Sequence, residues 1–340
     1  MEKNDIKRYG GLDGLRALSV IGIALMHIMF NGNYNIGGFV GEKFIGYMGE
    51  LVYLFMIISA FSMCCGYFEK ISKNQISPSA FYARRFEKIF PFFALMCVLD
   101  FAVAPSVNTA AELFAELTLC FGLLPNPCMS VIGVGWFIGL IFVFYICFPF
   151  FCTLIENKRR AWLFFAASVV FSLLCRFYFF DENHIVNMDY RANIIYVSPY
   201  FFAGGLIYLY RDTLSVIADK AKYIVLIACI GAAALYFWKG KYFWAELPLF
   251  SLLVIYGLQS RSLLLDNRVT KFLSSISMEI YLCHMLFFKA LQKVKLTHLF
   301  GSDVASYIVT SVMVIALAVA FSFLAKKAFA FISQRLKKRS

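Results

Sequence analysis

Charged residues are scarce in this chain of 340 residues. They make up 15% of it, whereas hydrophobic residues make up 61% and the mean hydropathy is +0.74. Long stretches carry no charge at all, which leaves no room for a sizeable soluble domain beside the apolar part. We therefore expect residues 1–340 to form a single integral-membrane domain with no appended soluble domain.

Several motifs of soluble enzymes are also lacking. The ten cysteines include no C-x-x-C pair, and the four histidines have no cysteine or carboxylate at the spacing of metal ligands. A phosphate-binding glycine loop and a G-x-S-x-G elbow are likewise missing. The sequence thus gives no sign of a metal centre, a nucleotide-binding loop or a serine hydrolase.

What the chain does contain is a series of apolar runs of roughly twenty residues, the length that a helix needs to cross a bilayer. We predict an all-α polytopic membrane bundle of about ten transmembrane helices. They are placed at residues 14–30, 45–66, 87–104, 131–152, 161–180, 194–210, 222–238, 242–258, 274–291 and 304–329. The piece 110–124, between the third and fourth helices, is expected on the surface or as a re-entrant helix.

The formal net charge of +12 has two readings, nucleic-acid binding or membrane topology. With the N-terminus placed in the cytoplasm, most Lys and Arg residues fall in inner segments and few in outer ones. Positive charge concentrates on the cytoplasmic side of membrane proteins, so this bias favours topology over nucleic acid. We predict both termini in the cytoplasm and an even number of spans.

Polar residues interrupt the first apolar run, "GLDGLRALSVIGIALMH" (Gly11 to His27). Arg16 and His27 are eleven residues apart, which is three helical turns plus about 20°, so both project from one face about 16 Å apart along the axis. Asp13 can pair with Arg16 one turn away. A histidine at this depth can take and return a proton. The alternative is a neutral histidine that hydrogen-bonds across helices as packing.

A basic cluster precedes the third predicted helix in "FYARRFEKIFP", where Arg84, Arg85 and Lys88 are expected at the cytoplasmic surface. Such clusters bind phosphates and diphosphates well. The alternative is ordinary anchoring of the cytoplasmic end of a helix.

Further polar positions lie in three other helices. Ser277, Tyr281 and His284 in "SISMEIYLCH" share one face of a helix, as an inward polar stripe or as packing. Trp136 in "GVGWFIGL" is either an interfacial anchor or a site residue. In the second helix, Glu50 at the outer end is either solvated or an acidic partner for proton transfer.

Together these stretches resemble the acyltransferase 3 family, bacterial membrane O-acyltransferases that modify sugars of surface polysaccharides, lipopolysaccharide, peptidoglycan or other glycans. The resemblance covers nearly the whole chain, in the order "LDGLRALSVIGIALMH", "VYLFMIISAF", "RRFEKIFP", "GWFIGL" and "SISMEIYLCH". Two positions depart from the family pattern. Ser59-Ala60 stands where the family has Ser-Gly, and Lys88 stands where it has Arg.

The resemblance implies a site that joins both sides of the membrane. An acyl-CoA, expected to be acetyl-CoA, would dock from the cytoplasm, with its phosphates on Arg84, Arg85 and Lys88 and with Arg16 deeper in the donor site. His27 would act as general base on a hydroxyl of a glycan or lipid-linked sugar from the outer side, or would first assist transfer of the acyl group across. The further catalytic candidates are Glu50, Tyr281 and His284, and the acceptor-binding candidates are Asp13, Ser59, Trp136 and Ser277.

Two other functions stay open at this point. A proton-coupled transporter or flippase of a small molecule or lipid-linked sugar would also place Arg16, His27 and Glu50 inside a membrane. A sensory or partner-binding membrane subunit is less consistent with the polar stripes. For either enzyme or transporter we expect a multi-pass protein of the plasma membrane.

Overall fold

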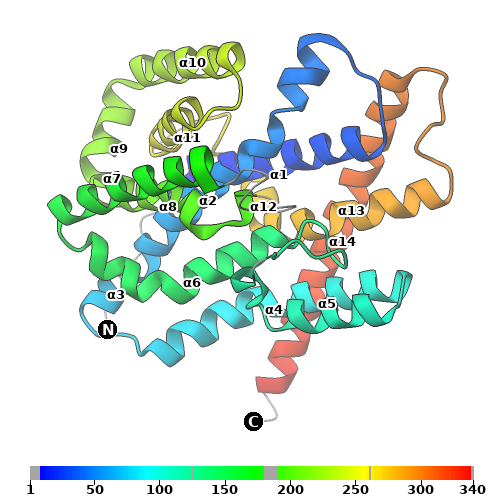
Figure 1. The fold of residues 1–340 in the computed structure, drawn as a ribbon, viewed down its shortest axis with the longest axis horizontal. Helices are drawn as coiled ribbons and strands as arrows, with labels where there is room; N and C mark the ends of the chain where they lie inside the picture. Colours follow the sequence, from blue (N-terminus) through cyan, green and yellow to red (C-terminus); the bar gives the residue numbers. More distant parts are fainter. Residues whose placement is uncertain (1–7, 125, 180–189, 260–261, 338–340) are drawn as a thin grey trace.

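The computed structural model describes residues 8–124, 126–179, 190–259 and 262–337, and this part of the chain is helical with no strands (Figure 1). Each of the ten predicted spans corresponds to a helix. These are α1 (Gly10–Asn31), α2 (Leu51–Met63), α4 (Pro78–Val103), α6 (Trp136–Ile155), α7 (Lys158–Leu174), α8 (Ile194–Leu209), α10 (Lys222–Lys239), α11 (Phe243–Gly257), α13 (Ser277–Lys293) and α14 (Asp303–Lys337). The prediction of an all-α membrane protein is confirmed.

Four shorter α-helices stand between the long ones. They are α3 (Glu69–Ser72), α5 (Val107–Leu117), α9 (Arg211–Lys220) and α12 (Arg268–Ser275). Two π-helical segments, Phe39–Ile45 and Cys64–Phe68, flank α2 on its two sides, so that the second apolar stretch is longer than its α-helical part. Within the described residues, six helical stretches are long and apolar enough to cross a membrane, and α8 and α11 are shorter apolar helices.

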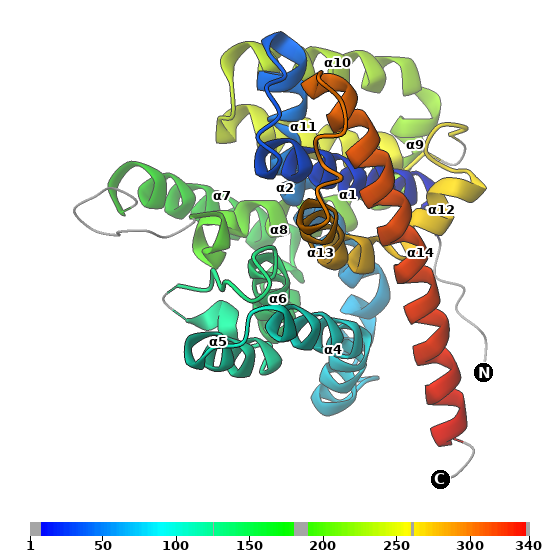
Figure 2. The same ribbon diagram turned by 90° about the vertical axis from the view of Figure 1, so that its right-hand side faces the viewer.

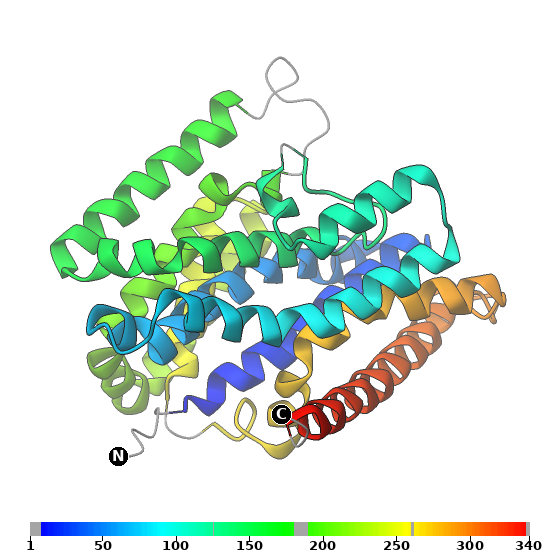
Figure 3. The same ribbon diagram turned by 90° about the horizontal axis from the view of Figure 1, so that it is seen from below.

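The long helices run side by side, with α7 (green) and α14 (red) at opposite edges of the bundle (Figure 3). Their positions agree with their burial, because α7 buries a far smaller share of its apolar window than α1 does. α1 lies among α2, α11, α12, α13 and α14, and most of its residues are buried. The helix that carries the polar stripe is therefore held by the protein on several sides rather than by lipid.

The third predicted helix begins earlier than the apolar pattern suggests. α4 starts at Pro78, and the Ser77 side chain accepts a hydrogen bond from the Ala80 amide at its N-terminus. Serine as the cap followed by proline is a strong start signal for a helix. The predicted start at residue 87 is therefore too late, since Arg84 and Arg85, expected before the helix, lie within it.

Two other boundaries also differ from the expectation. α6 begins at Trp136, after a turn at residues 131–135. The ninth predicted helix is broken at Ile276, whose φ of −122° and ψ of 18° separate α12 from α13. Such breaks depend on tertiary contacts and leave no clear mark in hydrophobic periodicity.

Small residues let the helices approach closely at two places. A Cβ on Gly11 would collide with the backbone of Gly257, so α1 meets the end of α11 only because position 11 is glycine. Ala60, which departs from the family pattern, faces Gly204 of α8, where an added Cβ would lie 2.8 Å from the Ala60 Cβ. The close contact between α2 and α8 is thus kept by a glycine on the opposite helix.

Ion pairs link residues that the charge-based topology places on the same side. Lys241 contacts Glu50 at 3.3 Å, and Lys289 contacts Asp100 at 3.1 Å, on the predicted outer side. Arg211 lies 3.9 Å from Glu69 on the predicted cytoplasmic side. These contacts agree with the predicted orientation, which stays a prediction because no membrane fixes the sides.

Candidate functional site

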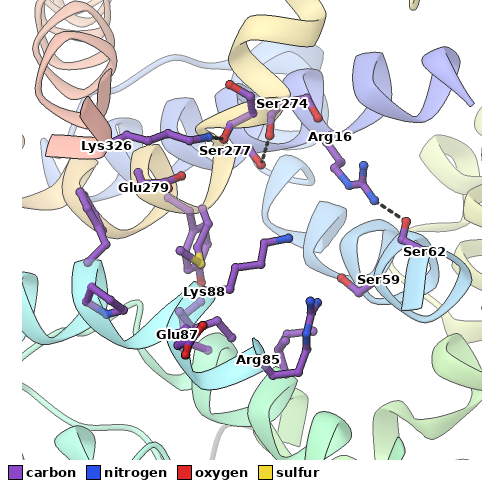
Figure 4. Close-up of a pocket in the computed structure, with 18 of the residues that line it drawn as sticks. Arg16, Ser59, Ser62, Arg85, Glu87, Lys88, Ser274, Ser277, Glu279 and Lys326 are labelled. Atoms are coloured by element: carbon purple, nitrogen blue, oxygen red, sulfur yellow. Dashed lines mark hydrogen bonds between the residues drawn. The ribbon is translucent and has the colours of Figure 1, made fainter. Parts of the chain in front are cut away.

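A cavity of about 1160 Å³ opens on the predicted cytoplasmic side, between α1, α2, α4, α6, α12, α13 and α14 (Figure 4). Its charged lining residues are Arg8, Asp13, Arg16, Arg85, Glu87, Lys88, Glu279 and Lys326. Cations thus outnumber carboxylates in the lining. Because the deeper walls are apolar and aromatic, these cations are less screened than they would be on an open surface, and the cavity suits an anionic ligand.

Arg16 is fixed in this cavity by contacts that the sequence only partly predicted. Its guanidinium lies 3.5 Å from the Asp13 carboxylate, as the one-turn spacing suggested. The same guanidinium also donates to the Ser62 hydroxyl of α2. Asp13 in turn accepts from Arg8 at 2.8 Å and from the Ser274 hydroxyl at 2.8 Å. The carboxylate therefore serves as an anchor for two guanidinium groups.

The basic cluster of α4 divides between the cavity and the surface. Arg85 lines the cavity, where it donates to the Tyr67 hydroxyl at 2.6 Å and lies 4.6 Å from the centre of that ring. The Lys88 ammonium points into the space between Arg16 and Arg85 (Figure 4). Arg84 is exposed and does not line the cavity, as expected for neighbours that diverge by about 100° on a helix.

Three of the four predicted acceptor-binding residues line this same cavity. They are Asp13, Ser59 and Ser277, of which Ser277 donates its hydroxyl proton to the Ser274 carbonyl at 3.0 Å. The fourth, Trp136, lies elsewhere, at the start of α6. Their role in binding an acceptor stays a prediction.

His27 and His284 form a pair in the interior. The His27 Nδ1 lies 2.9 Å from the His284 Nε2, and the two rings are nearly parallel, with centroids 5.2 Å apart. His284 is buried and His27 is half-buried. The two predicted catalytic histidines, 257 residues apart in the chain, are therefore brought into direct contact.

The contacts of His284 determine how the protons are arranged. Its Nδ1 lies 2.7 Å from the carbonyl oxygen of Tyr281, which can only accept, so Nδ1 must carry the hydrogen. In a neutral ring the Nε2 is then an acceptor, and the His27 Nδ1 donates to it. The Nε2 of His27 is left with a lone pair that points away from the pair. This nitrogen is the one with the chemistry of a general base.

Tyr281 connects the histidine pair to the turn before α6. Its hydroxyl donates to the Val134 carbonyl at 2.9 Å, and its ring lies 5.4 Å from that of Phe137 and 6.1 Å from that of His284. Trp136, the first residue of α6, follows this turn; it is buried and has the Arg191 guanidinium 5.5 Å from its ring centre. Tyr281 is thus placed to position both the turn and the histidine.

α5 holds this turn from the other side. The Glu112 carboxylate accepts from the Ser130 amide at 2.8 Å, and that of Glu116, one turn later, accepts from the Ile132 amide at 3.3 Å. Burial raises the pKa of Glu116 to about 7. The Ser106–Thr109 capping box starts the helix. The segment predicted as surface or re-entrant is therefore a short helix whose carboxylates fix the approach to Trp136.

Glu50 lies among charged groups of its own and not beside the histidine pair. It is buried, and its ion-pair partner is Lys241. Glu246 of α11 lies within Coulomb range of it and accepts from the Tyr200 hydroxyl at 3.2 Å. This outer acidic cluster was not found from the sequence, because Glu246 stands alone in an apolar stretch. The predicted catalytic role of Glu50 stays a prediction.

The passage predicted between Arg16 and His27 is not continuous in this structure. The cavity reaches Phe55, Ile138, Phe137 and Tyr281, but His27 and His284 do not line it. The Tyr281 ring, packed on Phe137, stands between the cavity and the histidine pair. Arg16 therefore faces solvent-accessible space, whereas His27 lies beyond an aromatic partition.

Several cavity residues were missed as site residues in the sequence, among them Ser62, Lys326 and Tyr67. Ser62 lies one turn from Ser59 and could have been found from that spacing. Lys326 is the first charged residue after the last apolar run, and it donates to the Ser275 carbonyl at the cavity rim. Tyr67, which holds Arg85, carries no signal in the sequence.

Comparison with known protein families gives one match. The family described as an acyltransferase domain, acyltransferase 3, matches residues 9–326, which is nearly the whole chain. No curated protein and no solved structure matches the chain.

Proposed function

The chain belongs to the acyltransferase 3 family, and from this membership we propose that it is a multi-pass O-acyltransferase of the plasma membrane. It transfers an acyl group, acetyl in the simplest case, from cytoplasmic acyl-CoA to a hydroxyl of a cell-surface or lipid-linked glycan. Acyltransferase activity follows from the family. The donor, the acceptor and the roles of individual residues are our proposal.

The observation that carries the proposal is the histidine pair. The Tyr281 carbonyl fixes the hydrogen of His284, and His284 fixes that of His27, so the His27 Nε2 is kept as a proton acceptor. The same relay arrangement orients the base in other acyl-transfer enzymes, although the third group here is a backbone carbonyl rather than a carboxylate.

The reaction then needs only one proton carrier. His27 Nε2 takes the proton of the acceptor hydroxyl, and the oxygen attacks the carbonyl carbon of the thioester. The carbon–sulfur bond breaks, the new ester forms, and the departing thiolate takes the proton back from His27 as free CoA. The products are the acylated glycan and CoA–SH, and the base returns to its starting state.

Donor binding is supported by the cations of the cavity. Arg85 and Lys88 on α4 would hold the diphosphate and phosphate groups, and Arg16 lies deeper on the way to His27. For the acyl group to reach His27, the Tyr281 and Phe137 rings must separate. The proposal therefore includes a movement of this aromatic partition during turnover.

Donor binding is tested first with purified protein. CoA and acetyl-CoA should raise its melting temperature, and dephospho-CoA should do so less because it lacks one phosphate. A transporter or flippase of an unrelated molecule has no reason to respond. No stabilisation by any of the three compounds would remove acyl-CoA as the donor.

The acceptor and the base are tested together in cells. Mass spectrometry of surface glycans should show an ester that is present in the wild type and lost both without the gene and with His27→Ala. His298→Ala, at an exposed histidine that contacts the Gly32 carbonyl, is the matched control and should keep the ester. If His27→Ala kept it, His27 would not be the base.

A further inference from the structure

α4 and α14 both line the cavity. The C-terminal half of α14 (red) diverges from α4 and extends beyond the rest of the bundle (Figure 2). Near the middle of α14, the rings of Phe92 and Phe321 still meet, at 6.0 Å. Beyond this contact, the two helices face each other across the cavity. Its lining there includes Pro91 of α4 and Ala330, Ile332 and Ser333 of α14, all of them exposed.

The charge pattern of both helices places this gap at the edge of the membrane. Lys88 is the last charged residue of α4 before an apolar stretch that runs to Asp100. Lys326 is the first charged residue of α14 after its first residue, Asp303. Pro91 therefore lies at the depth of the first acyl-chain carbons, and the segment after Lys326 lies near the headgroups. The gap therefore borders the acyl chains at Pro91 and the headgroups along the segment of α14 after Lys326.

The cavity behind this gap is lined by five cations and three carboxylates, so it carries an excess of positive charge. Lys88 lies close enough to Arg16, Arg85 and Lys326 for their charges to repel one another, and Glu279 compensates only in part. A phosphate placed among them relieves this repulsion. The gap in front of these cations, in contrast, is bordered by the apolar residues Pro91, Ala330 and Ile332. A phosphate site behind an apolar rim at the level of the headgroups suits an anionic amphiphile.

We propose that the gap between α4 and α14 is a lateral opening through which an anionic phospholipid of the cytoplasmic leaflet enters the cavity. Its phosphate lies among Lys88, Arg85 and Lys326, its headgroup passes Ala330, and its chains leave the opening beside Pro91 and remain in the membrane. Because these are also the cations proposed for acyl-CoA, the lipid competes with the donor. Only this competition rests on the proposed function, and the lipid site itself does not.

Lipid retention is measured by native mass spectrometry of the protein extracted from membranes in mild detergent. Wild type should keep one phosphatidylglycerol and no phosphatidylcholine. Ala330→Trp, which fills the opening, should lose it. Ala328→Trp is the matched control, because residue 328 is exposed on the same helix but lies about 200° away and does not line the cavity. Equal retention in the two tryptophan variants, or none in wild type, overturns the proposal.

A second measurement separates the lipid from its headgroup. Phosphatidylglycerol should raise the melting temperature of wild type and of Ala328→Trp by several degrees, and that of Ala330→Trp by much less. Glycerophosphoglycerol, which has the phosphate but no chains, should give no such difference between the variants. If the headgroup alone stabilised all three proteins as well as the lipid does, the site would be a phosphate site without a lateral opening.

Competition between the lipid and CoA is measured in a separate experiment on the melting temperature. Phosphatidylglycerol should weaken stabilisation of the wild type by CoA, and the weakening should disappear in Ala330→Trp. If CoA never stabilises the protein while lipid retention follows the expected pattern, then the proposed donor is wrong and the lipid site stands. If CoA binds without any effect of lipid, the lipid does not share the donor's cations.

Discussion

The two ends of the polar stripe on α1 differ in almost every physical respect. At the N-terminal end, Arg16 faces a large cavity and shares its carboxylate partner, Asp13, with Arg8. About three turns further along, His27 makes its contact with His284, and neither ring lines the cavity. The Arg16 end has space and an excess of positive charge, whereas the His27 end has a hydrogen bond whose donor and acceptor are defined.

This difference separates binding from proton transfer. A large anion needs space and several cations, and small displacements of those cations cost little. A base needs a single fixed tautomer, which an open and hydrated cavity would not maintain. Substitutions near Arg16 should therefore change how tightly the donor binds, whereas substitutions near His27 should change the rate of the chemical step. Three predictions test this division.

The largest effect is expected at His284. His284→Leu removes the acceptor that keeps the hydrogen on the His27 Nδ1, so kcat should fall on the order of 100-fold while the KM for acyl-CoA changes little. His284→Gln supplies an amide oxygen in place of Nε2 and should stay within about tenfold of wild type. Steady-state release of CoA with an acceptor measures both. Equal loss in the two variants would mean that His284 acts through packing alone.

A smaller effect is expected in the cavity. Arg85→Gln removes a guanidinium that faces the proposed phosphates, and the KM for acyl-CoA should rise about tenfold with kcat nearly unchanged. Arg84→Gln changes the adjacent, exposed arginine and should leave both constants as in wild type. Titration with acetyl-CoA gives the comparison. Similar effects of both substitutions would indicate that the helix end contributes general positive charge and no specific contact.

The smallest effect is expected at the position that departs from the family. Lys88→Arg introduces a planar, bidentate donor where the chain has a single ammonium, and the KM for acyl-CoA should fall about threefold. The same assay as for Arg85→Gln detects it. An increase in KM would show that the space around Lys88 is shaped for the smaller ammonium group.

Parts of this site could be predicted because they depend on one helix at a time. The one-turn spacing of Asp13 and Arg16 predicted their ion pair, which is confirmed, and the length of the apolar runs predicted the long helices. The start of α4 was missed, although Ser77 and Pro78 are a recognisable start signal, because the hydrophobic pattern begins later than the helix does.

Other parts depend on which helices meet. The role of Tyr67 in holding Arg85, the aromatic partition of Phe137 and Tyr281, and the pairing of Glu50 with Lys241 all join distant segments. Lys326 also lines the cavity only through contacts between distant segments, because α14 passes α4 and α12. Side chains of this kind have no common spacing in the chain, and so no periodicity could bring them together.

The amino-acid sequence by itself determined that this protein is a membrane bundle of helices and that Arg16 and His27 lie on one face of the first. These are consequences of apolar length and helical period, which each segment carries alone. Only the tertiary structure decided that His284 meets His27, which ring nitrogen keeps its lone pair, and that the cavity stops at Tyr281. Those outcomes depend on contacts between helices, because a proton's position is set by the partner across the interface and not by neighbours in the chain.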